Sequence, residues 1–100
     1  MKFARESITF REAKQAKDDI EIAVRNGDFV LDFEGVSRID STVIALSLYT
    51  LREAKRTGRT LRILAAPKGF ADLVKLYGLE TLLMPALERR SVRQRVRRTA

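Results

Sequence analysis

The chain has 100 residues, of which 45% are hydrophobic and 33% are charged, and its formal net charge is +7. This length and composition are typical of one small globular domain with a modest core, and they exclude a two-domain protein. The chain contains no cysteine and no histidine, which excludes disulfides, Cys or His metal sites and the usual Ser-His or Cys-His nucleophile pairs. Catalysis would have to rest on carboxylates and lysines.

The distribution of charge separates the chain into two parts. Residues 88–100 contain six arginines and one glutamate, whereas residues 1–87 carry 14 basic and 12 acidic side chains. The body has no basic stripe interleaved with aromatic residues, so we predict no specific nucleic-acid binding. The N-terminus lacks the apolar segment of a signal peptide, and no window approaches the roughly 20 apolar residues that span a bilayer. We therefore expect a cytoplasmic protein.

The first helix is predicted from its N-terminal cap. Thr9-Phe10-Arg11-Glu12 has the S/T-x-x-E form of a capping box, which indicates a helix that begins near Phe10. The apolar residues that follow recur at helical spacing and predict one buried face. They are Ala13, Ala16, Ile20, Ala23 and Val24. Asn26-Gly27 predicts the end of this helix, because glycine adopts the left-handed conformation that often follows a helix.

A strand, a helix and a second strand come next. Residues 29–33 are apolar except for Asp32, which predicts an interior parallel strand, and residues 34–38 predict a loop. Residues 41–57 predict a helix that is apolar nearly all round for two turns, so its first half should be covered by something besides the sheet. Residues 61–65 predict the second strand. This order indicates a right-handed βαβ unit.

The last part of the body predicts one more helix. Pro67 is suited to the first position of that helix, and Gly78 to its end. The apolar face would comprise Phe70, Leu73, Val74 and Tyr77. Together the elements predict an α/β domain over residues 1–87, with a small mixed, mostly parallel β-sheet and helices packed against it. Pro85 should break the chain from an arginine-rich tail over residues 88–100.

The turn before the second helix places polar side chains at a helix start. A side-chain oxygen of Asp40 or Ser41 can accept a hydrogen bond from an unpaired amide of the first turn. The same amides and the helix dipole favour a phosphate or an acidic partner. The simplest interpretation is that Asp40 or Ser41 is only the N-cap.

The sequence around this turn resembles a known family. Residues 31–41, the apolar helix and residues 58–63 are similar to the core of the STAS domain, which is found in anti-sigma factor antagonists and sulfate transporters. The resemblance is greater to the MlaB-type branch, the cytoplasmic STAS subunit of the Mla phospholipid-transport ABC complex. Residues 6–10 and 73–79 resemble segments of that branch, so the similarity spans roughly residues 5–87.

The resemblance implies a protein without catalytic chemistry or a cofactor, which docks on a partner through the start of the second helix. The implied contact residues are Asp40, Ser41, Thr42, Ile44, Ala45 and Leu48. In the Mla branch the partner is an ABC ATPase, and through it a permease at the inner face of the membrane. In the antagonist branch an anti-sigma kinase phosphorylates the serine equivalent to Ser41. The family usually has glycine where this chain has Val43, and a branched side chain there would narrow the approach of a kinase.

Two further hypotheses remain. An enzyme is disfavoured because the only clustered carboxylates are Asp32, Glu34 and Asp40, and each has an ordinary role in a strand end, a loop or a cap. We therefore predict no catalytic and no metal-binding residue.

The arginine tail offers a weak contact with anionic membrane, since several arginines together give a salt-sensitive attraction to anionic lipid. Composition does not separate the ATPase-binding subunit from the antagonist, because both use one fold and one docking surface.

Overall fold

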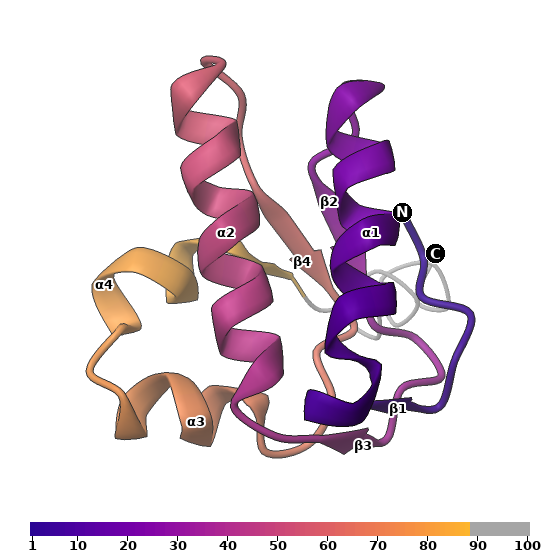
Figure 1. The fold of residues 1–100 in the computed structure, drawn as a ribbon. Helices are drawn as coiled ribbons and strands as arrows, with labels where there is room; N and C mark the ends of the chain where they lie inside the picture. The colour runs from indigo at the N-terminus through magenta and orange to yellow at the C-terminus, as the bar shows by residue number, and fades with distance from the viewer. Residues whose placement is uncertain (89–100) are drawn as a thin grey trace, which may run out of the picture.

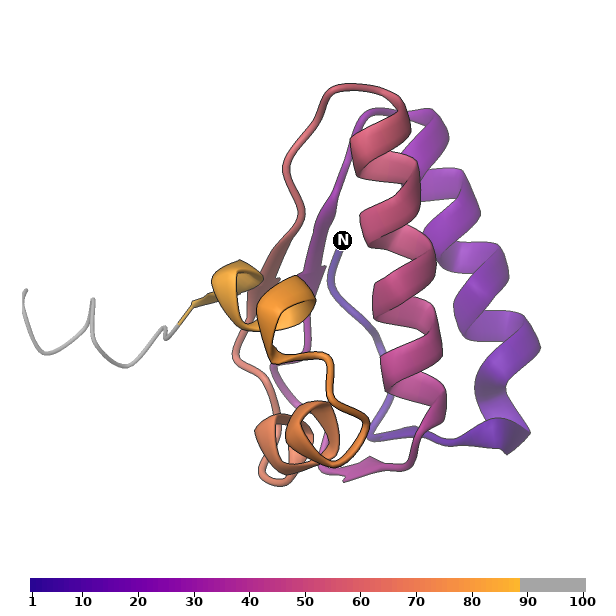
Figure 2. The same cartoon turned by 90° about the vertical axis from the view of Figure 1, so that its left-hand side faces the viewer.

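The computed structural model describes residues 1–88, in which two long helices lie side by side against a small sheet (Figure 1). The elements in chain order are β1 (Ser7–Ile8), the 3-10 helix η1 (Phe10–Glu12), α1 (Ala13–Arg25), β2 (Val30–Asp32), β3 (Arg38–Ile39), α2 (Thr42–Arg56), β4 (Arg62–Leu64), α3 (Phe70–Leu76), α4 (Glu80–Leu83), the 3-10 helix η2 (Met84–Ala86) and β5 (Leu87–Glu88). Seen from the side, α1 and α2 form one layer and β2 and β4 the next (Figure 2). The predicted α/β class is confirmed.

The strands form two small parallel sheets. One has the order β2-β4-β5, with Leu31 opposite Ile63, and the other pairs β1 with β3. Lys2 forms a parallel bridge with Asp32 on the other side of β2, so β2 has neighbours on both sides, as its apolar sequence predicted. Every strand pair within residues 1–88 is parallel, so the expected mixture of strand directions is not found there.

The core lies between the sheet and the long helices. Its fully buried side chains include Ile20 from α1, Val43 from α2 and Ile63 from β4. A row of three phenylalanine rings extends it toward α3. Phe33 lies 5.0 Å from Phe3 and 5.5 Å from Phe70 between ring centroids, and both pairs are tilted. The row fixes the N-terminal segment and α3 to the end of β2.

The inner side of α2 carries two buried hydroxyl residues. Ser47 and Thr50 are fully buried, and their hydroxyls donate to the carbonyls of Val43 at 2.7 Å and Leu46 at 2.8 Å. Because these bonds stay within the helix, burial leaves neither hydroxyl unpaired. The small side chains at these positions let α2 lie close to the rest of the core.

The start of α1 agrees with the sequence prediction. The Thr9 amide donates to Oε1 of Glu12 at 2.8 Å, and both halves of the capping box are present. Only the first turn differs, because residues 10–12 form a 3-10 helix before the α-helix begins at Ala13. Gly27 follows the helix with φ of +79°, as predicted for a residue past a helix end.

The start of α3 differs from the prediction. The helix begins at Phe70 and not at Pro67, because Gly69 adopts φ of +91° directly before it. That left-handed conformation cannot continue an α-helix back toward Pro67. The carbonyl of Pro67 instead accepts a hydrogen bond from the Phe70 amide at 3.0 Å, which closes a turn. The predicted role of Pro67 is therefore wrong, whereas Gly78 does end the helix.

The folded body continues past Pro85, so the predicted break there is wrong. Pro85 lies within η2, Ala86 is buried, and Leu87 pairs with Ile63. The guanidinium of Arg62 donates two hydrogen bonds to the Glu88 carboxylate, at 2.6 and 2.8 Å. Pairing with β4 therefore keeps this segment in the sheet. The remainder of the predicted tail, residues 89–100, lies outside the described residues.

Candidate docking site at the start of α2

Asp40 caps α2. Its Oδ1 accepts a hydrogen bond from the Thr42 amide at 2.8 Å, and its Oδ2 accepts one from the Phe10 amide at 3.1 Å. One carboxylate therefore satisfies an unpaired amide of α2 and also joins α2 to η1. Of the two residues that the sequence offered as N-cap, Asp40 performs the role.

The hydrogen bonds keep Asp40 charged. Burial opposes the charged form, but the amide and hydroxyl of Thr42 and the amide of Phe10 together outweigh it. The pKa of Asp40 therefore lies below its ordinary value. At neutral pH the cap is a carboxylate, which places a fixed negative charge at the start of the helix.

Ser41 is exposed and does not cap the helix. Its φ of −62° and ψ of −11° are helical, whereas a capping side chain needs an extended backbone. Within residues 1–88 the Ser41 side chain makes no capping hydrogen bond, although its carbonyl accepts from the amides of Ile44 at 3.0 Å and Ala45 at 3.2 Å. The hydroxyl therefore lies at the surface, accessible to a partner or to a modifying enzyme.

The outer face of α2 presents a narrow surface that we name the α2 stripe. It comprises Ser41, Ala45, Leu48 and Arg52, which helical spacing places on one side of the helix. Leu48 is half-buried and the other three are exposed. The helix α1 packs along one flank of α2 and α3 contacts the other (Figure 1). The stripe is thus a part of α2 that remains open to a partner.

The structure removes Ile44 from the contact surface implied by the resemblance. Its side chain is 5% exposed and belongs to the core, as do Val43 and Leu46 from the same two turns. Most of the apolar side chains in the first two turns of α2 are therefore buried inside the domain. The prediction that the first half of α2 is covered by something besides the sheet is confirmed, because α1 and α3 both contact this helix.

Val43 also differs from its expected role. The sequence suggested that a branched side chain here would narrow the approach of a partner. The Val43 side chain is fully buried, so it does not reach the outer face of α2. The departure from the usual glycine therefore places no obstacle on the docking surface.

Phe10 is a surface residue that the sequence patterns did not assign to the site. Its side chain is 74% exposed, and its amide is bonded to Asp40. The helical repeat that predicted the buried face of α1 began at Ala13, so it gave Phe10 no packing role. An aromatic residue outside such a repeat, next to a polar turn, is the signal that would have identified it.

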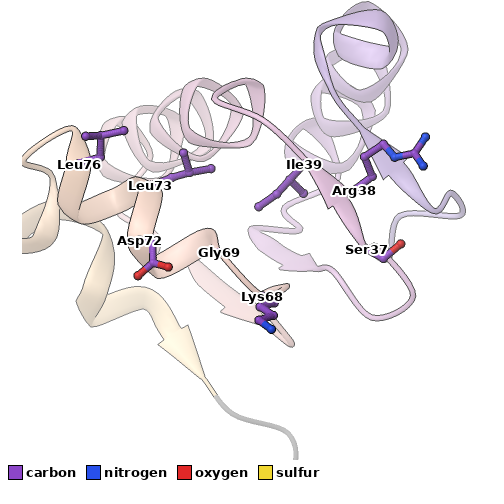
Figure 3. A pocket seen from close by; sticks show the side chains of 8 residues that line it. All are labelled: Ser37, Arg38, Ile39, Lys68, Gly69, Asp72, Leu73 and Leu76. Carbon is purple, nitrogen blue, oxygen red and sulfur yellow. The ribbon is translucent and has the colours of Figure 1, made fainter.

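An open groove of about 600 Å³ lies between β3 and α3, at the end of the molecule where α2 begins (Figure 3). It is lined by Ser37, Arg38, Ile39, Lys68, Gly69, Asp72, Leu73 and Leu76. The strand β3 leads directly into Asp40, so the groove adjoins the docking site. Its lining contains two cations and one carboxylate at exposed positions, which is not a convergent catalytic set.

Residues 1–88 contain no group of three His, Cys, Asp or Glu side chains placed to hold a metal ion. None of the helices in that range is both long enough and apolar enough to cross a membrane.

Comparison with known proteins bears on fold and family. Residues 4–85 match the family model described as "Mlab, STAS domain". Among solved structures, the fold is similar to that of the Bacillus cell fate determinant SpoIIAA in its phosphorylated form, with a TM-score of 0.62 and 18% sequence identity. This similarity covers 94% of the present chain and 84% of the SpoIIAA chain, and it shows a common fold. No curated protein matches the chain significantly.

The family match confirms the resemblance inferred from the sequence. STAS domains are generally non-enzymatic domains that bind and regulate partner proteins, which agrees with a site made of a capped helix start and an exposed stripe. Since the family model covers most of the chain, the protein belongs to the STAS domain family, in its MlaB-type branch.

Proposed function

We propose that this protein is a non-catalytic assembly subunit that binds the cytoplasmic ABC ATPase of an Mla-type phospholipid transport system. The observation that carries the proposal is the exposed α2 stripe beside a fixed cap, in a chain that matches the MlaB-type family. In this proposal the protein acts in the cytoplasm, at the inner face of the membrane. The ATPase and its permease would hold it there.

The shape of the stripe suits close contact with another protein. Ser41 and Ala45 are small and exposed, so a partner can approach the helix surface closely, and Leu48 adds a half-buried apolar edge. The cap made by Asp40 fixes the first turn before a partner arrives. A surface that is already ordered loses little conformational entropy when it binds. The stripe is therefore a suitable docking surface for a stable complex.

A second candidate function is that of an anti-sigma factor antagonist regulated by phosphorylation of Ser41. It is favoured by the exposed Ser41 hydroxyl at a helix start and by the similar fold of SpoIIAA, which was solved in a phosphorylated form. A helix N-terminus stabilises a phosphate, whereas the neighbouring Asp40 carboxylate repels it. The local electrostatics of Ser41 thus contain one favourable and one opposing contribution.

Capture of the ATPase tests the first function. The tagged full-length chain is expressed with the Mla-type ATPase of the same organism, and the captured ATPase is quantified. Wild type is expected to retain it, whereas Ala45→Glu places a charge in the stripe and should abolish retention. Ala71→Glu is the matched control, since Ala71 is equally an exposed helical alanine but lies on α3.

The same preparation distinguishes the second function. Equal retention of the ATPase by Ala45→Glu and wild type would contradict docking through the stripe. Intact mass measurement of the protein purified from its own cells would favour the antagonist if it showed a phosphate on Ser41 together with a bound serine kinase and no ATPase.

A further inference from the structure

The second half of α2 is basic on its outer side. Arg52, Lys55 and Arg56 are all exposed there. The acid among them, Glu53, accepts a hydrogen bond from Arg56 at 2.7 Å. Neither Arg52 nor Lys55 forms an ion pair with any other residue in the range 1–88. Arg52 at the end of the α2 stripe and Lys55 one turn beyond it are therefore two positive charges without an ion-pair partner in residues 1–88.

The neighbouring helix α1 differs in the signs of its charges. Its outer face mixes charges of both signs, and Lys14 pairs with Asp18 at 3.1 Å, as is common on a solvated helix. The helix dipole explains a preference for Lys55 and Arg56, which lie in the last turn of α2. It does not explain Arg52, which lies before that turn. The basic half of α2 therefore calls for a further explanation.

We propose that the protein partner docked on the α2 stripe carries acidic side chains opposite Arg52 and Lys55, next to an apolar patch opposite Ala45 and Leu48. This inference rests on the proposed function and specifies the chemistry of the partner. Ser41 and Arg52 lie about 16 Å apart along the helix, at 1.5 Å per residue. One interface of ordinary size covers both ends. The charges then fix which way the partner lies along α2, since a reversed orientation leaves its carboxylates unpaired.

The stripe itself favours a protein over a lipid surface as the occupant. Its first half offers the small side chains of Ser41 and Ala45 and the half-buried Leu48. A helix that lies in a membrane interface instead needs several large apolar side chains to insert between the acyl chains. A protein partner is therefore favoured, because its surface can pack against the small residues at one end and pair with the two cations at the other.

The test is the affinity of the full chain for the Mla-type ATPase of the same organism at 50 mM and at 1 M salt. Arg52→Glu with Lys55→Glu reverses both charges, and Lys2→Glu with Lys75→Glu is the control that changes net charge equally outside α2. At low salt we expect at least about tenfold weaker binding for the α2 variant and less than about twofold for the control. At 1 M salt the affinities of the α2 variant and the control should become similar, because salt screens exposed charges.

Each outcome has a distinct meaning. A second variant, Arg52→Gln with Lys55→Gln, removes the charges without adding repulsion and should lie between wild type and the reversed variant. If wild type binds the ATPase but the reversed variant equals its control, this inference fails and the proposed function stands. If wild type does not bind the ATPase at all, both fail. Loss of binding to phosphatidylglycerol vesicles with undiminished ATPase binding would assign the basic half to a membrane and overturn the inference.

Discussion

The amide of Phe10 donates a hydrogen bond of 3.1 Å to Oδ2 of Asp40, which connects two segments 30 residues apart in the sequence. The other oxygen of the same carboxylate caps α2. The 3-10 helix η1 and the start of α2 consequently lie together at one end of the molecule (Figure 1). This arrangement places the backbone of Phe10, whose ring is exposed, at Asp40 and so beside the start of α2.

Removal of the Asp40 carboxylate is expected to destabilise the fold more than removal of the Ser41 hydroxyl. Asp40→Ala loses the cap of α2 and the bond to η1, which together should cost about 1 to 2 kcal/mol. Ser41→Ala should cost less than about 0.5 kcal/mol, because the Ser41 side chain does not cap the helix. Urea unfolding of both variants measures the difference. The reverse order of the two effects would show that Ser41 is the cap.

Acid should weaken the domain through its two capping carboxylates. The Thr9 amide and hydroxyl lower the pKa of Glu12. At Asp40 burial acts to raise the pKa, but the hydrogen bonds from Thr42 and Phe10 outweigh burial, so the pKa of Asp40 is lowered as well. Groups with depressed pKa values stabilise the folded state above their unfolded pKa and lose that contribution as the pH falls through the folded value. Stability should therefore fall below about pH 4. Urea unfolding between pH 7 and 3 tests this, and Asp40→Asn should reduce the slope.

Phe10 is expected to contribute to partner binding and little to folding. Its ring is 74% exposed, so Phe10→Ala should change the free energy of unfolding by less than about 0.5 kcal/mol. Aromatic side chains at an interface are common hot spots, and the ATPase affinity should fall about tenfold. Ile22→Ala is the matched control, since Ile22 is also an exposed large apolar residue and lies on α1. Equal effects of the two variants on affinity would remove Phe10 from the interface.

A negative charge on Ser41 should block docking without unfolding the domain. The carboxylate added by Ser41→Asp is stabilised by the helix start and repelled by the neighbouring Asp40. These two effects oppose each other, so the melting temperature should change by only a few degrees. Capture of the ATPase should be lost with Ser41→Asp and retained with Ser41→Ala. Unfolding of Ser41→Asp, or full capture by it, would show that this position does not control docking.

The sequence predicted those elements whose signals are local. The capping box at Thr9 and the glycines after α1 and α3 set helix ends through their own backbone preferences, and the structure agrees with each. The two-residue strands β1, β3 and β5 were missed, because only pairing with another strand makes them strands. The predicted break at Pro85 was wrong for the same reason, because Leu87 and Glu88 pair with β4 after this proline.

The candidate site was predictable in position but not in which side chains reach the surface. The turn at Asp40 and the start of α2 were identified from the sequence, and in the structure Ser41 is exposed there while Asp40 and Thr42 are half-buried. Whether Ile44 points into the core depends on how α1 and α3 pack against α2, which local periodicity does not specify. Phe10 was missed because its neighbour in the site, Asp40, is distant in sequence.

Site-specific crosslinking in the assembled complex tests the docking surface most directly, and the chain suits it because it contains no cysteine. A photoreactive label is attached to Ala45→Cys in the stripe and, as control, to Ala71→Cys on α3. Each labelled protein is mixed with the Mla-type ATPase and irradiated, and the crosslinked peptides are identified by mass spectrometry. We predict strong crosslinks to the ATPase from position 45 and few from position 71. The opposite pattern, or equal crosslinking from both, would contradict docking through the α2 stripe.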